Sequence, residues 1–272
     1  IQVYFQQNQQ LHLSLDKARE IKQNTEGWIT GILLTSQVDK KHSAFQARLG
    51  RISGFSLQDY FLQILEQLPE EINSFLLWTS LLEEFDVARC AEVIEPAIYK
   101  DYAPWQQWMN FIQQNNLFVL PVGEQGDWLR YHPLFLDFLQ NTIIGEQPEV
   151  AKAILQNLAR VSIQYNEWDQ AFSIYRKLGV QEDLIQLIEK FGLEMILQGR
   201  LSTLSSWFDS LPAEVLNAKP YIIALQGNVA WVLGNTSLAM TLYNQALNRM
   251  TLPDNRDEMI IVLSMRSATL RL

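Results

Sequence analysis

Three similar stretches in the second half of the chain constrain its fold more than any other feature. They begin at the turn-forming residues Asn166, Gly199 and Gly234, so they are 33 and 35 residues apart. In the first and last stretches a tyrosine follows at the same offset, at Tyr175 and Tyr243. A self-similar period of this length is typical of helix–turn–helix units that bury their apolar faces only against neighbouring units. The sequence therefore predicts stacked helix pairs.

The last stretch carries the most detailed repeat signal. Its small residues Gly227, Ala239 and Ala246, the aromatic Tyr243 and the following Pro253 occupy the positions typical of tetratricopeptide (TPR) repeats. Small residues let paired helices approach closely, and the aromatic ring fills the space toward the next pair. We interpret these residues as core. A ligand would bind on the concave face of a TPR-like superhelix, and the sequence does not mark which polar residues lie there.

The part before these repeats combines short helices with one hairpin. Apolar residues at helical spacing, with Ser56, Pro69, Asp86 and Pro104 as starting signals, predict helices over 57–68, 69–79, 87–94 and 105–114. Two strand-like runs, 117–120 and 128–131, then flank the turn residues Gly123–Asp127. Helices followed by a two-stranded wing describe a winged helix. The predicted fold class is mainly α: a winged-helix domain with a small β-hairpin wing, followed by a TPR-like α–α superhelix.

A winged helix raises the possibility of direct DNA binding, but the charge of this module argues against it. Residues 51–141 contain four basic and thirteen acidic side chains, and the whole chain carries a net charge of −9. The predicted helix 105–114, which stands in the place of a recognition helix, contains no Lys or Arg. Phosphate contacts need cations, so we expect no DNA contact from this part, no membrane contact, and DNA binding only through a domain outside this chain.

Length and composition indicate how the chain is organised. Its 272 residues suggest about two domains, and a start at Ile1 together with a helical pattern at the end suggests part of a longer protein. We expect three ranges: a helical remnant of an upstream domain over 1–50, the winged helix over 51–145 and the repeats over 146–272. A single cysteine, Cys90, excludes an internal disulfide and fits a cytoplasmic location. No apolar run of membrane-spanning length occurs in the sequence.

The stretch Asp127–Leu139 reads as a strand that runs directly into a helix, with His132 at the joint. Pro133 suits the first helical position, where its missing N–H costs nothing. His132 then lies at or next to a helix N-cap, where the helix dipole and free amides favour an anion. A histidine adds a donor that can gain charge. The alternative is a buried or surface histidine that caps its own helix.

The sequence lacks the usual signatures of enzymes. It contains no Gly-rich phosphate loop, no dinucleotide-binding fingerprint and no nucleophile elbow. Three histidines and one cysteine show no metal-ligand spacing. We therefore expect no catalytic residue, no metal site and no enzyme activity in this chain.

Four segments in this order resemble MalT-like transcriptional regulators, which are STAND-class signal-transduction ATPases that often end in a LuxR-type DNA-binding domain. The first, Thr25–Trp28, is similar to a helix near the end of that family's nucleotide-binding region. The second, Leu68–Pro69 with Phe75–Leu82, resembles its winged-helix core. The third, Asn115–Phe118 with Arg130–Leu139, resembles its wing and the next helix. The fourth segment, Trp207–Pro212, resembles a recurrent element of its helical repeats.

The resemblance implies that this chain is an arm that connects a nucleotide-binding switch to a sensor. It implies that residues 1–50 end a nucleotide-binding region, and that His132 contacts the β-phosphate of ADP in a closed resting state. ATP or ADP with Mg²⁺ would bind the full-length protein and not this chain alone, because the P-loop and the acidic Mg²⁺-binding strand are not in this sequence. The implied partners are the upstream nucleotide-binding domain and an inducer or regulatory protein on the repeats. The alternative is a helical-repeat interaction scaffold without nucleotide switching.

Overall fold

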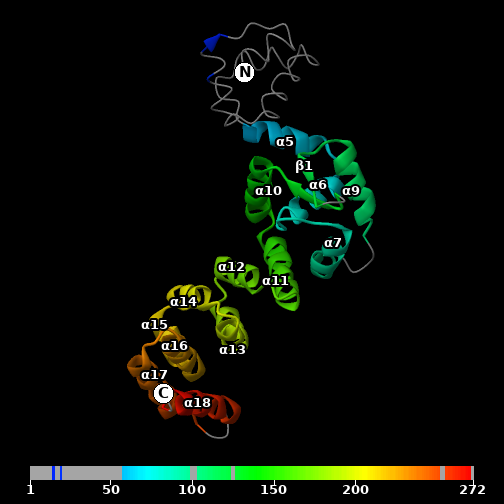
Figure 1. Cartoon of the computed structure of the whole chain (residues 1–272). Helices are drawn as coiled ribbons and strands as arrows, with labels where there is room; N and C mark the ends of the chain where they lie inside the picture. Colours follow the sequence, from blue (N-terminus) through cyan, green and yellow to red (C-terminus); the bar gives the residue numbers. More distant parts are fainter. Residues whose placement is uncertain are drawn as a thin grey trace. The chain divides into compact units, whose positions relative to one another are not determined.

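The computed structural model describes residues 14, 15, 19, 57–98, 103–123, 126–251 and 255–270. The chain divides into two compact units, Ile1–Ala151 and Lys152–Leu272, and each is described separately (Figure 1). The helices and the domain remnant expected within residues 1–50 lie outside the described residues, apart from Ser14, Leu15 and Arg19. The three domain ranges stay a prediction. Among the described helices, none combines the length and the apolar character that crossing a membrane requires.

The described part of the first unit contains the four helices that the apolar spacing predicts and one short helix, Glu95–Ile98, that the spacing does not predict. Asp86 caps α7 as expected, since its carboxylate accepts the Arg89 amide at 2.6 Å. The last of these helices buries Trp105, Trp108, Met109 and Ile112, which are the four residues predicted to share one face. The helices are α5 (Leu57–Gln67), α6 (Glu70–Thr79), α7 (Val87–Val93), α8 (Glu95–Ile98) and α9 (Trp105–Gln114).

The wing is an antiparallel hairpin of β1 (Val119–Val122) and β2 (Trp128–Tyr131). The second strand is as predicted, but the first starts two residues later than the predicted 117–120, so that prediction was wrong. The cause is Phe118, whose φ of 57° is left-handed and incompatible with a strand. On its other side β2 forms a bridge to Phe85, with N···O distances of 2.9 and 2.8 Å to Leu129. Thus β2 lies between two backbone partners.

Aromatic rings form the core between α5, the segment that leads into the wing, and α10 (Pro133–Glu146). Phe61 of α5 lies at the centre, with ring centroids 5.3 Å from Phe118, 4.9 Å from Phe135 and 5.2 Å from Phe138. All four side chains are buried. Because these residues come from three separate segments, their packing fixes the wing and α10 against α5.

The second unit consists of helices packed in sequence order, with α12 against α13, α13 against α14 and α16, and α17 against α16 and α18. Phe172 and Trp207 stack almost in parallel between two of these helices, with centroids 4.3 Å apart. The helices are α11 (Pro148–Gln164), which starts before the unit boundary, α12 (Trp168–Leu178), α13 (Gln181–Leu197), α14 (Leu201–Asp209), α15 (Ala213–Ala218), α16 (Pro220–Val232), α17 (Thr236–Arg249) and α18 (Arg256–Thr269).

The three predicted repeat turns share one backbone geometry. Asn166, Gly199 and Gly234 have φ of 60°, 76° and 85°, and each lies two residues after the last residue of a helix. At every turn the next amide donates to a carbonyl five residues back at 2.8 Å, from Glu167, Arg200 and Asn235 to Ser162, Met195 and Ala230. The sequence period is therefore a structural period as well. The short α15 is an addition between α14 and α16, and the predicted TPR-like class of these repeats stays a prediction.

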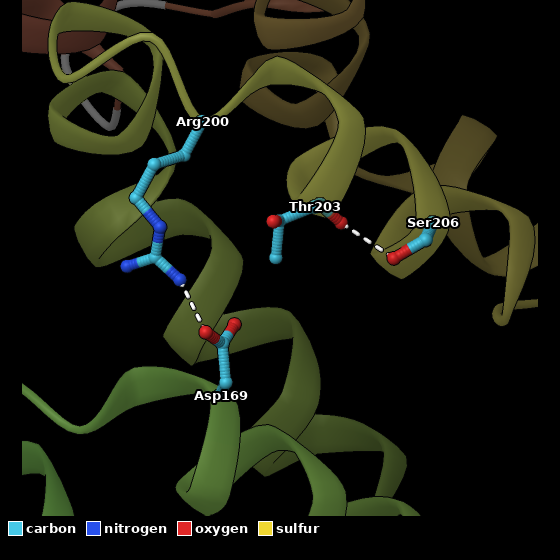
Figure 2. Close-up of polar contacts among 4 residues, drawn as sticks. All are labelled: Asp169, Arg200, Thr203 and Ser206. Atoms are coloured by element: carbon cyan, nitrogen blue, oxygen red, sulfur yellow. Dashed lines mark hydrogen bonds and ion pairs between the residues drawn. The ribbon is translucent and has the colours of Figure 1, made fainter.

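Polar side chains also connect neighbouring turns in this unit. Figure 2 shows Arg200, which precedes α14, reaching the Asp169 carboxylate at 2.5 Å at the start of α12. The same guanidinium lies over the Trp168 ring, 5.7 Å from its centroid. Inside α14 the Ser206 hydroxyl donates to the Thr203 carbonyl at 2.7 Å. Since Arg200 and Asp169 are partly solvated, we expect their ion pair to contribute at most about 1 kcal/mol.

Candidate functional site

The structure places His132 where the sequence predicts it, between β2 and α10. It is the N-cap residue of α10, with φ −60° and ψ 136°, and Pro133 follows at the start of the helix. Its side chain makes no capping hydrogen bond to the helix. The side-chain capping bond that the alternative interpretation assumes is therefore not formed in this structure, and the anion role of His132 stays a prediction.

The backbone of His132 is held on both sides. Its amide donates to the Phe118 carbonyl at 2.8 Å, and its own carbonyl accepts the amides of Phe135 and Leu136 at 3.0 and 2.9 Å. Pro133 has no amide hydrogen to offer. Most polar backbone groups of the joint are thus used within the fold, so the imidazole is the group best suited to contact a ligand.

The surroundings of the imidazole disfavour a positive charge on it. The side chain is half-buried, and this burial lowers the pKa of His132 below its ordinary value. We therefore expect a neutral ring at pH 7, which can donate one hydrogen bond and accept another. The first turn of α10 contains no acidic residue, so no carboxylate there would repel an anion.

The exposed face of the wing adds a cation beside this position. Along β2, Trp128 and Arg130 are exposed while Leu129 and Tyr131 are buried. His132 lies one residue beyond β2 and two residues after Arg130. Within the part of the chain that the structure describes, Arg130 forms no ion pair. Its charge is therefore available to an anionic ligand at the joint.

A buried hydrogen-bond chain anchors the residue before the histidine. The Tyr131 hydroxyl lies 2.6 Å from Thr79 Oγ1, and Thr79 Oγ1 donates to the Phe75 carbonyl at 2.7 Å. Because the Thr79 proton is already used, Tyr131 is the donor of the first bond. Burial raises the pKa of Tyr131 well above its usual range, which keeps the phenol protonated. This chain connects β2 to α6 and fixes the strand end that leads to His132.

We expect Tyr131→Phe to lower the free energy of unfolding by about 1 kcal/mol, because it removes one buried hydrogen bond and leaves the ring packing intact. Urea denaturation of the single variants and of Tyr131→Phe with Thr79→Val gives a double-mutant cycle. The two substitutions should be coupled, with a coupling energy of about 1 kcal/mol. Additive effects would mean that the hydroxyl pair contributes nothing.

The helix before the wing has an uncharged exposed face. The residues that α9 exposes are Gln106, Gln107, Asn110, Gln113 and Gln114, all of them uncharged. Non-specific DNA affinity comes mainly from cations on phosphates. Direct DNA contact by α9 stays untested, and its exposed face contains no Lys or Arg.

The described residues contain no other group with clear site chemistry. None of their His, Cys, Asp and Glu side chains form a group of three or more that could hold a metal. Cys90 is buried in α7, and burial, with Asp86 nearby, raises the pKa of its thiol well above the usual range. A neutral buried thiol is a poor nucleophile.

Comparison with known proteins identifies the first unit. Residues 62–151 match the family described as the MalT winged helix domain, and this match ends at the last residue of the first compact unit. The chain is MalT-like. The MalT-type winged helix thus contains the joint at His132, and the predicted resemblance is confirmed.

The similarity extends beyond the winged helix. The HTH-type transcriptional regulator MalT of Vibrio parahaemolyticus serotype O3:K6 is 26% identical over 225 residues, covering 80% of this chain and 24% of that protein. The MalT of Vibrio cholerae serotype O1 is 24% identical over 220 residues, or 79% of this chain and 23% of the relative. The MalT of Klebsiella pneumoniae strain 342 is 24% identical over 230 residues, which cover 81% of this chain and 24% of that protein. The MalT-like chain spans about a quarter of these relatives' length.

Sequence reasoning found His132 but missed the residues that hold it. The sequence pattern predicts Phe118 and Tyr131 in strands and Thr79 on a helix face, and it predicts no role for them at the joint. Asn116, which also has a left-handed φ of 50°, was a local signal for an irregular link before the wing. No sequence pattern indicates that the Phe118 carbonyl faces the His132 amide.

Proposed function

We propose that this chain is the regulatory arm of a transcriptional regulator that switches between ADP-bound and ATP-bound states. The proposal is supported by the MalT-type winged helix and by relatives named as transcriptional regulators that match about 80% of the chain. In this proposal the nucleotide-binding domain precedes the winged helix, and residues 1–50 are its end. ATP or ADP with Mg²⁺ belongs to that domain in the full-length protein, and this chain alone binds neither tightly.

The winged helix stabilises the resting state through His132, which contacts a phosphate of ADP. The observation that carries this role is a half-buried imidazole at the N-cap of a 14-residue helix whose first turn contains no carboxylate. The positive end of the helix dipole favours an anion there. Arg130, exposed on β2 two residues before His132, adds positive charge.

Protonation and phosphate binding are linked at this position. Burial lowers the pKa of His132 in the free protein, whereas a neighbouring phosphate would raise it by stabilising the imidazolium form. Phosphate binding therefore favours proton uptake. By the same linkage, ADP should be held more tightly as the pH falls toward the ordinary pKa of histidine.

The test replaces His132 with Ala in the full-length protein and measures retained ADP and basal transcription. Loss of one hydrogen bond to a charged group is worth about 1.5–3 kcal/mol, so ADP should dissociate roughly ten- to a hundredfold faster. Basal activity should rise because the resting state is weakened. Asp137→Ala, an exposed change one turn further along α10, is the matched control and should leave both unchanged. Unchanged ADP retention in His132→Ala would contradict the phosphate role.

The helical repeats serve as the sensor in this proposal. They receive a small-molecule inducer or a regulatory protein, which favours the ATP-bound form if it binds that form more tightly. The output is DNA binding through a domain outside this chain. The net charge of −9 is consistent with that division of roles.

One observation favours the alternative of an interaction scaffold without nucleotide switching. Near the three repeat turns, the large side chains of Tyr165, Leu197 and Leu233 are exposed, one, two and one residues before the turn residue. Exposed apolar side chains near successive turns suit a protein-binding edge. Purified full-length protein that carries no nucleotide and has no affinity for ADP would support the scaffold over the switch.

A further inference from the structure

We infer that Phe118 is a positioning residue for His132, which it holds through a strained backbone conformation and a carbonyl aimed at the histidine amide. The significance of this role rests on the proposed phosphate contact, whereas the positioning itself is a property of the free chain. Phe118 lies between α9 and β1, outside both elements.

The backbone conformation of Phe118 is unusual for its side chain. Its φ of 57° lies in the left-handed region, which bulky residues with a Cβ rarely adopt and which costs about 1 kcal/mol or more. Such a conformation persists only where the surrounding structure enforces it. Here its amide donates to the Asn116 carbonyl at 2.8 Å, which bends the chain sharply just before the strand.

Packing of the buried Phe118 ring stabilises this backbone conformation. Only 9% of the residue is exposed, and its ring lies 5.3 Å from Phe61 and 4.7 Å from Phe135, measured between centroids. Moving the backbone to an ordinary φ would turn the ring out of this buried cluster. The apolar contacts therefore offset the backbone strain.

The conformation of Phe118 fixes the backbone position of His132. With the ring fixed, the Phe118 carbonyl points across the hairpin and accepts the His132 amide at 2.8 Å. This bond closes the end of the wing, one residue beyond the β1–β2 pair Val119 and Tyr131. It fixes the peptide from which the imidazole projects, while the Tyr131–Thr79 bond fixes the residue before it. If Phe118 adopted an ordinary φ, this bond would be lost and the His132 side chain could rotate away from the axis of α10.

The chain contains three histidines, so selective ¹⁵N and ¹³C labelling of histidine gives only three sets of NMR signals. The set that disappears in His132→Gln belongs to His132. The readouts are hydrogen exchange of the His132 amide and the pH titration of its ring, both without nucleotide. In Phe118→Ala the amide should exchange at least tenfold faster. The ring titration should move up toward the ordinary histidine value, because the ring gains solvent.

A variant that only destabilises the unit separates positioning from general loosening. Val93→Ala removes two buried methyl groups in α7 and should shift the urea midpoint while leaving the His132 titration unchanged. Phe118→Leu keeps an apolar anchor and should restore most of the wild-type titration. If Phe118→Ala does not fold, Phe118→Leu should still show several-fold faster exchange of the His132 amide.

A folded Phe118→Ala variant with wild-type amide exchange and wild-type ring titration at His132 would overturn the inference. If Phe118→Ala does not fold, wild-type amide exchange at His132 in Phe118→Leu would overturn it. Neither readout involves ADP. Thus, if His132→Ala retains ADP normally, the phosphate role fails and the positioning of His132 by Phe118 can still hold. If Phe118→Ala leaves His132 unchanged, the positioning fails and the phosphate role can still hold.

Discussion

Replacing Phe61 with Ala is expected to destabilise the Ile1–Ala151 unit by about 3–5 kcal/mol, the usual range for a fully buried phenylalanine. Only 1% of Phe61 is exposed, and its ring contacts three others, Phe118, Phe135 and Phe138. Truncation removes the apolar transfer free energy and leaves a cavity lined by rings from the wing and α10. Those rings are held by their own backbones and can fill the cavity only in part.

Urea denaturation followed by tryptophan fluorescence measures this effect, because Trp105, Trp108 and Trp128 belong to the same unit. Leu62→Ala is the matched control: it changes the adjacent residue of α5, which is 42% exposed, and should cost well under half as much. Equal losses in the two variants would show that α5 contributes through helix formation and not through the aromatic cluster. The Phe61→Ala variant should also loosen Phe118, and with it the joint at His132.

The second large effect is expected for Gly227→Ala in α16, which should lower the stability of the Lys152–Leu272 unit by about 2 kcal/mol. A Cβ at this position would lie 2.9 and 3.0 Å from two carbons of the Tyr243 ring and 3.2 Å from Leu242 Cβ. Tyr243 is fully buried between helices, so its ring cannot move without displacing neighbours. The helix-propensity gain of about 1 kcal/mol offsets only part of this clash.

Gly145→Ala provides the matched control, because Gly145 is a helical glycine whose added Cβ would meet nothing within 4 Å. It should raise the free energy of unfolding by about 0.5–1 kcal/mol through helix propensity alone. Thermal and urea unfolding of both variants give the comparison. If Gly227→Ala were as stabilising as Gly145→Ala, close packing of α16 on α17 would not require glycine.

Local chemistry explains why much of the fold could be predicted from the sequence. The four buried residues of α9 repeat at helical spacing, and Asp86 caps its helix through a residue three positions away. Pro133 specifies a helix start by its own geometry, which places His132 at the N-cap. The turns at Asn166, Gly199 and Gly234 repeat because each needs a residue that tolerates a positive φ. These signals act within a few residues, so one sequence suffices to read them.

The tertiary structure alone decided how the candidate site is held. The Tyr131–Thr79 bond joins residues 52 positions apart, and the Phe118 ring meets partners from α5 and α10. These contacts overrode local strand propensity at Phe118 and moved the start of β1 by two residues. By itself the sequence determined the helices, the repeat turns and the place of His132, because those depend on neighbours along the chain. The strain at Phe118 and the direction of its carbonyl depend on packing among distant segments, which only the folded chain brings together.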